Sequence, residues 1–399
     1  MSNFELIEET FKGEPPFRIK QIKSLIFKDL ISDWDQATVL PVEMRKKLNE
    51  IFPLAISSRF FISKKENSVK ALIILKDGLK IETVLMRHSP RFFSDHELMN
   101  SKEERRSRFA RIDEKNANIS LEKKWGKDRN TVCVSSQVGC PLACAFCATG
   151  QRGFKRNLDK WEIVEQVLLF ARWLKNRKSL GSDYREGSRD CFVVPLRGTP
   201  RNDIINKINN VVFMGMGEPF LNYDNVLAAI KILNDKEGFN LGARHFSIST
   251  VGITEGIEKL AQEKMEVNLA ISLHAPNDKL RSSIMPINKK YPLGKILRAV
   301  DEYIKQTRRR VMFEYIMIEE INDSDDCARQ LADLLKNTLG FVNLITYNPT
   351  GIFKPSSSQR LNKFKEILEK AGVAVTQRYR FGDDIKGACG QLAGNANNN

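Results

Sequence analysis

Three closely spaced cysteines are the residues of this chain whose type and spacing most directly indicate chemistry. They stand in the stretch Cys140-Pro-Leu-Ala-Cys144-Ala-Phe-Cys147, just after a strand-like run at Thr131–Ser136. Thiolates are soft ligands for zinc and for iron–sulfur clusters. Three cysteines can hold three irons of a 4Fe–4S cube and leave the fourth iron open, whereas a structural zinc normally has four protein ligands. No fourth Cys or His lies nearby, Cys133 being the nearest candidate, so the spacing favours an open cluster and leaves zinc as the alternative.

A second candidate motif is Gly215-Met216-Gly217-Glu218-Pro219, at the end of the strand-like run Val211–Met216. Glycines allow the backbone to approach a ligand closely, and a carboxylate at such a position can accept a hydrogen bond from an ammonium group. The alternative is a plain glycine turn with a solvated glutamate.

The elements that must position these motifs alternate between strand and helix from residue 131 onward. Strand-like runs are Thr131–Ser136, Val211–Met216, His245–Thr250, Val267–His274, Val311–Ile318, Val342–Tyr347 and Val373–Arg378. Amphipathic helical stretches between them include Trp161–Leu174, Asn225–Leu233, Leu293–Ile304 and Cys327–Leu339. About six such repeats predict an α/β fold with a parallel sheet and right-handed crossovers, and we favour a partial barrel over a doubly wound sheet. In such folds the chemistry lies at the carboxyl ends of the strands.

The rest of the chain divides around this repeat. Residues 1–60 are expected to form a small helical accessory domain, and residues 61–130 a β-hairpin linker in which Lys76-Asp77-Gly78 supplies the turn. The barrel is assigned to residues 131–380 and a C-terminal loop to 381–399. Residues 87–130 carry 12 Lys and Arg against 8 Asp and Glu, and residues 174–210 carry 8 against 4, so both are expected to be basic surface insertions. The Asn395–Asn399 tail is expected to be disordered.

Composition limits the classes of partner. The 399 residues carry 64 Lys and Arg against 49 Asp and Glu, a net charge of +15, and no apolar stretch is long enough for a membrane span. The first residues lack the pattern of a signal peptide, so a cytoplasmic protein is expected, in which the seven cysteines would not form a disulfide framework. The charge indicates a polyanionic partner, with RNA or DNA favoured over a basic surface without a specific partner.

Several separated motifs together resemble one family. They are Cys133-Val-Ser-Ser-Gln-Val-Gly-Cys140, the three-cysteine stretch, Gly153-Phe-Lys-Arg-Asn157, Phe213-Met-Gly-Met-Gly-Glu-Pro219, Ser272-Leu-His-Ala-Pro-Asn277, Met285-Pro-Ile-Asn-Lys289 and Gly382-Asp-Asp-Ile-Lys-Gly-Ala-Cys-Gly-Gln-Leu392. This set resembles the RlmN/Cfr family of dual-cysteine radical S-adenosylmethionine (SAM) methyltransferases, which methylate adenine in RNA. The resemblance implies a partial (β/α)6 radical SAM barrel with a 4Fe–4S cluster on Cys140, Cys144 and Cys147.

The resemblance also implies a mechanism. Cys389 matches the cysteine that takes a methyl group from one SAM, and a second SAM supplies the radical that activates this methyl group toward an electron-poor adenine carbon. Glu82 matches the proton acceptor, although a lone Glu in a hairpin would otherwise be a solvated residue. Cys133 matches the cysteine that attacks Cys389 and forms a transient disulfide. The glycine, serine and polar residues around both cysteines favour exposed, reactive thiols.

The contacts to SAM are implied residue by residue, and all fall at the ends of expected strands: Gly217, Glu218, Ser249, Ser272, Leu273, His274 and Asn348. Cys191 and Cys327 match no family motif and are interpreted as structural. The chain departs from the family in two places. The link from Glu82 to Cys133 is much longer than usual, and only ten residues follow Cys389, which predicts a loosely held C-terminal loop.

Within the family, carbon 2 and carbon 8 of adenine are both known targets, and the motif context favours carbon 2. The implied partners are 23S rRNA, tRNA and a flavodoxin-type electron donor, and a monomer is expected. Two other classes stay open: a non-catalytic RNA-binding protein with a structural zinc, and a radical SAM enzyme that modifies a peptide. The second of these would not need the Cys133 and Cys389 pair.

Overall fold

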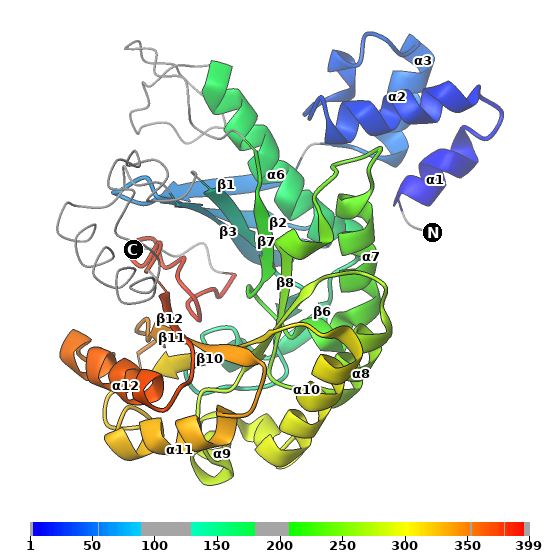
Figure 1. Ribbon diagram of the computed structural model, residues 1–399. Coiled ribbons are helices and arrows are strands. Elements are labelled where there is room, and N and C mark those ends of the chain that lie inside the picture. Colours follow the sequence, from blue (N-terminus) through cyan, green and yellow to red (C-terminus); the bar gives the residue numbers. More distant parts are fainter. Residues whose placement is uncertain are drawn as a thin grey trace, which may run out of the picture.

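The computed structural model describes residues 3–54, 56–88, 129–179, 207–351, 353–378 and 380–394. Most of the two expected insertions, Cys191 and the Asn395–Asn399 tail lie outside these ranges. Figure 1 shows a curved sheet with helices around its outer side and a separate group of helices at the N-terminus.

Ten strands form the main sheet in the order β1-β2-β3-β4-β7-β8-β9-β10-β11-β12. The antiparallel part contains β1 (Ser57–Ile62), β2 (Ser68–Ile74), β3 (Lys80–His88) and β4 (Arg129–Cys133). From β4 onward the neighbours are parallel: β7 (Asn210–Phe213), β8 (Phe246–Thr250), β9 (Asn268–Ser272), β10 (Val311–Met317), β11 (Gly340–Thr346) and β12 (Val375–Arg378). The expected partial barrel is therefore confirmed.

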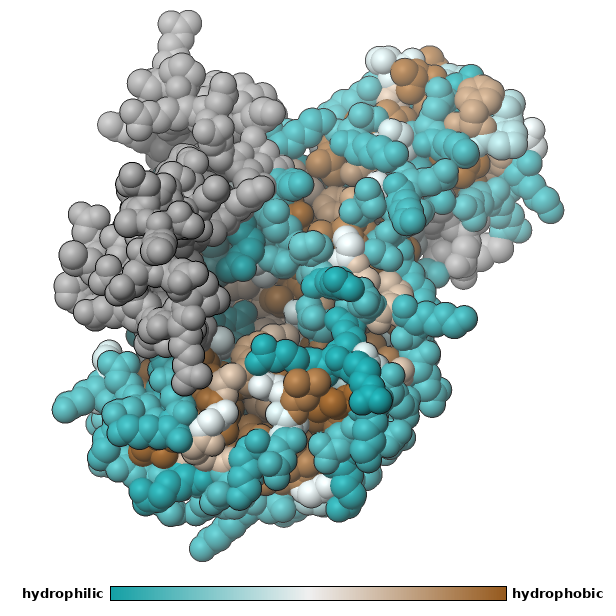
Figure 2. Space-filling view, in the orientation of Figure 1, coloured by the Kyte–Doolittle hydropathy of each residue, from teal (hydrophilic) through white to brown (hydrophobic). Residues whose placement is uncertain are grey.

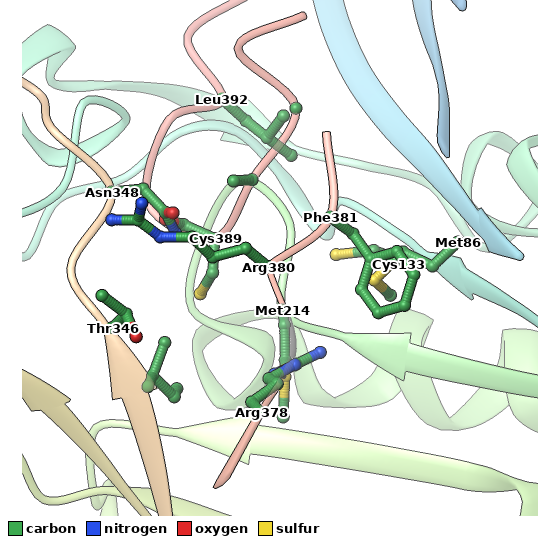
Figure 3. A pocket seen from close by; sticks show the side chains of 13 residues that line it. Met86, Cys133, Met214, Thr346, Asn348, Arg378, Arg380, Phe381, Cys389 and Leu392 are labelled. Carbon is green, nitrogen blue, oxygen red and sulfur yellow. The ribbon is translucent and has the colours of Figure 1, made fainter. Parts of the chain in front are cut away.

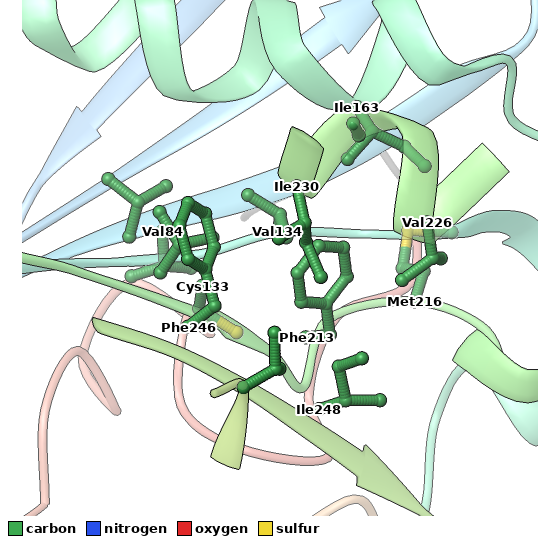
Figure 4. Packing of buried hydrophobic residues seen from close by; sticks show 14 of the residues in the cluster. Val84, Cys133, Val134, Ile163, Phe213, Met216, Val226, Ile230, Phe246 and Ile248 are labelled. Carbon is green, nitrogen blue, oxygen red and sulfur yellow. The ribbon is translucent and has the colours of Figure 1, made fainter. Parts of the chain in front are cut away.

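Each of the six crossovers between the parallel strands carries a helix that packs on the outside of the sheet (Figure 1). These helices are α6 (Lys160–Ser179), α7 (Tyr223–Asn234), α8 (Thr254–Gln262), α10 (Leu293–Thr307), α11 (Asp325–Leu335) and α12 (Ser358–Lys370), with a short additional helix, α9 (Asp278–Ile284). Serine caps fix the starts of two of them, because Ser324 accepts from Cys327 N and Ser357 from Arg360 N. Their apolar faces and the strands form one continuous core, part of which Figure 4 shows.

The N-terminal helical unit packs against the start of the barrel. It contains α1 (Asn3–Thr10), α2 (Pro16–Phe27) and α3 (Val42–Ile51). Trp161 in α6 contacts the rings of Phe27 and Phe52, with centroids 6.2 and 5.4 Å apart. Arg172 Nε, also in α6, donates to Ile31 O at 2.9 Å. The first barrel helix therefore joins the accessory unit to the barrel.

A small ribbon that the sequence did not suggest lies next to the cysteine motif. Strand β5 (Gln137–Gly139) pairs with β6 (Phe154–Asn157) in an antiparallel, two-stranded sheet. The expected strand Thr131–Ser136 is thus shorter, ends at Cys133 and is followed by the ribbon. Strand β1 and helices α8 and α12 are not among the elements named from the sequence, whereas the hairpin around Asp77 forms as expected.

The described surface is mainly polar. Figure 2 shows hydrophilic side chains over most of the visible face, with hydrophobic ones where this face is hollowed. Among the described residues, none of the helices combines the length and the apolar character needed to cross a membrane.

Candidate active site

The three-cysteine loop lies at the carboxyl end of the sheet, between β5 and β6. Its course is fixed by backbone hydrogen bonds: Cys140 N donates to Gly153 O at 2.9 Å, and Ala145 N donates to Ile284 O at 2.9 Å. Cys144 is buried and the other two cysteines are half-buried. All three thiols are free and belong to one short loop.

The electrostatics of this loop suit a thiolate-bound cluster. Burial, together with the nearby Cys147, raises the pKa of Cys140 to about 12. The pKa of Cys144 is raised well above its ordinary value by burial and by Cys147 and Cys140. Three thiolates in one short loop repel one another unless positive charge neutralises them, so three cysteines are a donor set that suits irons held by thiolates.

In the described part of the chain, no three His, Cys, Asp or Glu side chains, those of the cysteine loop included, converge on a point that would hold one ion. Cys133, the nearest candidate for a fourth ligand in the sequence, lines a different pocket together with Cys389.

Glu218 follows β7 and is buried, with both carboxylate oxygens in use. Oε1 accepts from Phe220 N at 3.0 Å and Oε2 accepts from Val251 N at 2.9 Å. Burial raises the pKa of Glu218 to about 7, although these hydrogen bonds oppose the shift. Its charge also acts on Cys140 and Cys144, so the carboxylate lies close to the cysteine loop. The interpretation of Glu218 as a solvated turn residue is therefore wrong.

The glycines of the same motif are required by protein packing. A Cβ atom at Gly215 would lie 2.6 Å from Val134 O, and one at Gly217, where φ is +99°, would lie 2.5 Å from the Gln137 side chain. Close approach to the β4–β5 segment thus explains both glycines without a ligand, and it places Glu218 beside the cysteine loop.

The other residues expected to bind SAM gather at neighbouring strand ends. The hydroxyls of Ser249 in β8 and Ser272 in β9 lie 3.3 Å apart. His274 is buried with φ at +58°, and its ring contacts Phe146 of the cysteine loop edge-on at 4.8 Å. Burial and Arg281 lower the pKa of His274 to about 3, so the ring is neutral. Because Nδ1 accepts from Ile316 N at 3.1 Å, the proton lies on Nε2.

Two buried polar atoms near these strand ends have no partner among the described residues, which is a sign of a ligand site. One is Asn348 Oδ1, on a side chain whose Nδ2 donates to Cys389 O at 3.1 Å. The other is Oε1 of Glu314 in β10, whose Oε2 accepts from Asn343 at 2.8 Å. Asn348 is one of the residues expected to contact SAM. Glu314 is not, although a single acidic residue inside the apolar strand Val311–Met317 is a signal that could have identified it.

Cys133 and Cys389 lie on opposite sides of one pocket, as Figure 3 shows. Cys133 ends β4 and is buried, whereas Cys389 in the C-terminal loop is exposed to the pocket. The expectation of two exposed thiols is therefore wrong for Cys133, because the serine and glycine residues that follow it lie in a buried segment, 134–139. Burial raises the pKa of Cys133 to about 12 and also raises the pKa of Cys389.

Arg378 is the cation of this pocket. It ends β12, lines the pocket with both cysteines, and its Nη1 lies 2.9 Å from Met214 Sδ (Figure 3). Its positive charge lowers the pKa of both thiols and opposes the effect of burial. The charge of the buried Glu314 also acts on Arg378 and favours its protonated form.

Glu82 reaches this region in spite of the long link to Cys133. Strands β3 and β4 pair in register from Val84↔Cys133 to His88↔Arg129, so the additional chain forms the connection beyond His88. Glu82 is two residues before Val84 and is buried, with Ser135 Oγ donating to its carbonyl oxygen at 2.6 Å. The interpretation of Glu82 as a solvated hairpin residue is therefore wrong.

The C-terminal loop is held on several sides, in contrast to the loosely held loop that the sequence predicts. Thr149 Oγ1 donates to Leu392 O at 2.6 Å and Ala148 N donates to Gly390 O at 2.8 Å. These contacts fix the Cys389 segment against the end of the cysteine loop. Cys327, by contrast, is buried in α11, in keeping with a structural role.

Comparison with known proteins places this chain in a family. Residues 202–331 match the model of the radical SAM superfamily. The probable dual-specificity RNA methyltransferases RlmN from Dictyoglomus thermophilum and Carboxydothermus hydrogenoformans are each 40% identical; the matches cover 95% of this chain and 91% and 92% of those proteins. The crystal structure of a radical SAM methyltransferase from Sphaerobacter thermophilus superimposes with a TM-score of 0.79 at 36% identity and 98% coverage of both chains.

Proposed function

Since this chain belongs to the RlmN family of radical SAM RNA methyltransferases, we propose that it methylates carbon 2 of an adenine in RNA. The observation that carries the proposal is the pocket shared by Cys133 and Cys389, at the end of the sheet where the cysteine loop lies. A methyltransferase that acted on a nucleophilic atom would need neither thiol. A target carbon without nucleophilic character needs a carrier for the methyl group and a means of releasing it.

The cofactors have sites that fit them. Cys140, Cys144 and Cys147 would hold a 4Fe–4S cluster, which when reduced supplies the electron that cleaves SAM to a 5′-deoxyadenosyl radical. SAM would bind at the strand ends, at Gly217, Glu218, Ser249, Ser272, Leu273, His274 and Asn348. The unpartnered Oδ1 of Asn348 and the neutral His274 ring are groups that a polar ligand there would satisfy.

Three residues of the chain would carry out the transfer. The Cys389 thiolate accepts the methyl group of one SAM and so forms a methylthioether. After the activated carbon has bonded to the adenine ring, Glu82 accepts the proton that the ring carbon loses. The Cys133 thiolate then attacks the sulfur of Cys389: the S–S bond forms as the S–C bond breaks, and the carbon keeps the electron pair and takes up a proton to become the methyl group of the released base. The positive charge of Arg378 favours the thiolate form of both cysteines during these steps.

The proposed substrates follow from the relatives, whose name describes dual-specificity RNA methyltransferases. We propose 23S rRNA in the peptidyl-transferase region and the adenine beside the tRNA anticodon. The N-terminal unit of residues 1–60 would bind RNA, and the C-terminal segment 381–399 would carry the methylated cysteine. A cytoplasmic monomer that receives electrons from a flavodoxin-type protein completes the proposal.

An anaerobic assay tests the function. The reconstituted enzyme is incubated with SAM, a low-potential reductant and either rRNA or tRNA, and the digested RNA is analysed by mass spectrometry. We expect 2-methyladenosine. The appearance of 8-methyladenosine would instead assign the carbon-8 reaction. A colourless protein with stoichiometric zinc and no methylated RNA would contradict the enzymatic proposal.

A further inference from the structure

Lys70 is a buried ammonium group with no assigned role, next to the proposed base. It lies in β2, and its side chain is 1% exposed. Its Nζ lies 3.0 Å from Glu82 Oε1, whose side chain is 3% exposed. The ammonium also lies over the ring of Phe61, 5.1 Å from its centroid. Burying two charges costs free energy that only close pairing and additional hydrogen bonds can offset, so the further partners of this pair show what it holds in place.

Those partners are backbone groups on both flanks of Cys389. Lys70 Nζ donates to Lys386 O at 3.4 Å, three residues before the cysteine. Glu82 Oε2 accepts from Ala393 N at 2.7 Å and from Gly394 N at 3.1 Å, four and five residues after it. One ion pair on the β2–β3 hairpin therefore contacts the loop before and after the reactive thiol.

Glycine at position 394 permits this contact. Its φ is +68°, and a Cβ atom there would lie 2.8 Å from Lys80 O in β3. The loop thus approaches the hairpin backbone directly at the point where its amides reach Glu82.

We propose that Lys70 is a positioning residue that orients Glu82 and fixes the Cys389 loop to the same hairpin. Without it, Glu82 would lose its ionic partner and the loop would lose one of its two contacts with this ion pair. In the present arrangement Oε2 of Glu82, the oxygen not paired with Lys70, is occupied by the Ala393 and Gly394 amides. These amides must give way before that oxygen can accept a substrate proton, so the anchor and the base use the same atom. This last step rests on the proposed function, whereas the anchoring role does not.

Hydrogen–deuterium exchange of the purified full-length protein tests the anchoring role without any assay of activity. Lys70→Met should speed exchange of the 386–394 amides at least several-fold, because both anchors depend on the ion pair. Lys70→Arg keeps the charge and should restore most of the protection. Lys80→Met, a change to an exposed lysine of the same hairpin, is the matched control and should leave exchange unchanged. Exchange in Lys70→Met equal to that of the wild type would overturn the proposal.

A second measurement tests the catalytic consequence. The anaerobic reaction of Lys70→Met should accumulate protein covalently linked to RNA, relative to wild type and Lys80→Met, because a misplaced Glu82 slows release. If exchange rises while the wild type itself fails to methylate RNA, the anchor stands and the proposed function fails. If Lys70→Met does not fold, as judged by circular dichroism, Glu82→Gln replaces it in the exchange experiment. Its neutral amide cannot form the ion pair, so faster exchange of Ala393 and Gly394 supports the anchor, and unchanged exchange overturns it.

Discussion

At the scale of single residues, the site combines carboxylates, thiols and one arginine. Burial is the main cause of the raised pKa values of Cys133, Cys389 and Glu218. The polar residues around Cys133 and the place of Glu82 as a lone acid in a hairpin strand indicated surface positions, yet both residues are inside the protein. Burial raises the pKa of Cys133, and the guanidinium of Arg378 acts in the opposite direction. The reactivity of the two thiols therefore depends on a residue that no sequence motif identified.

The cysteine pair supports one prediction. Cys389→Ala should abolish RNA methylation but leave the iron and sulfide content unchanged, because the methyl carrier is removed and the cluster ligands are kept. Cys133→Ala should instead trap protein crosslinked to RNA, since the adduct forms and cannot be resolved. Cys327→Ala, at a buried cysteine of α11, is the matched control and should methylate normally. Methylation at the wild-type rate by both active-site variants would disprove the dual-cysteine mechanism.

Arg378 supports a prediction about pH dependence. Its charge lowers the pKa of Cys133 and Cys389, so a thiolate forms at lower pH with it than without it. Arg378→Met should move the pH profile of alkylation by iodoacetamide to higher pH and slow the reaction about tenfold at a fixed pH below the thiol pKa. Arg378→Lys should preserve much of the rate.

The control for that experiment is Arg380→Met. Arg380 lines the same pocket, but its Nη2 donates to Tyr347 O at 2.8 Å, and it is not among the charges that act on either thiol. A profile that moves equally in Arg378→Met and Arg380→Met would refute the specific role of Arg378.

At the scale of elements, the site depends on two antiparallel strand pairs, the β5–β6 ribbon and the β2–β3 hairpin. The β5–β6 ribbon holds the start of the cysteine loop, and the β2–β3 hairpin brings Glu82 to β4. Arg156 in the ribbon joins them, because it pairs with Asp77 in the hairpin turn at 2.6 Å and with Glu162 in α6 at 2.8 Å. The ribbon, the hairpin and the first barrel helix are thus linked at one side chain.

The ribbon supports a prediction through Gly139. Its φ is +78°, and a Cβ atom would lie 1.9 Å from Gly153 O, which accepts the hydrogen bond from Cys140 N. Gly139→Ala should cost about 1–3 kcal/mol or more and displace the first cluster ligand. The measurement is iron and sulfide per chain after anaerobic reconstitution, which should fall clearly.

Gly372→Ala is the matched control, because its φ is +82° but nothing lies within 4 Å of the added Cβ atom. It should lose about 1–2 kcal/mol of stability from backbone strain and keep the wild-type iron content. Equal iron content in the two variants would show that the ribbon does not position the cluster loop.

At the scale of the whole molecule, the net charge of +15 is spread over parts with different roles. The segments 87–130 and 174–210 carry an excess of basic residues, and most of both lies outside the described residues. We expect them to act as auxiliary phosphate contacts, which contribute affinity without selecting sequence.

The register of β3 and β4 gives a clean way to test this. His88 and Arg129 face each other across the ladder, so residues 89–128 can be replaced by an Asn-Gly turn that leaves the strands paired. The slope of log Kd for RNA against log salt should flatten by about one unit for each RNA phosphate that the shortened protein no longer neutralises. A neutral Gly/Ser linker of the same length controls for chain length and should give the same flattening. An unchanged slope in both variants would exclude a role of this segment in RNA binding.

The sequence predicts the fold of this protein more completely than the details of its site. Alternating apolar segments from Thr131 onward are enough to predict the parallel sheet, because each strand and helix must bury its own apolar face. The β5–β6 ribbon is too short to show such a pattern, and Glu314 occupies one position in a strand that is otherwise apolar. Local patterns therefore predict most of the long elements, with α12 as an exception, and miss short ones and single buried charges.

The sequence by itself determined which chemical groups this protein carries: the three-cysteine spacing, the glycine motif and the cysteines at 133 and 389 are covalent facts that folding does not alter. Only the tertiary structure decided how that chemistry is organised. Burial sets the pKa of Cys133, the pairing of β3 with β4 brings Glu82 to the site across a long insertion, and Lys70 and Glu82 contact both sides of the Cys389 loop. These properties depend on groups that are far apart in the chain. Glu82 and Ala393, for example, are separated by 311 positions. Their interaction exists only where the packed core holds them within hydrogen-bonding distance.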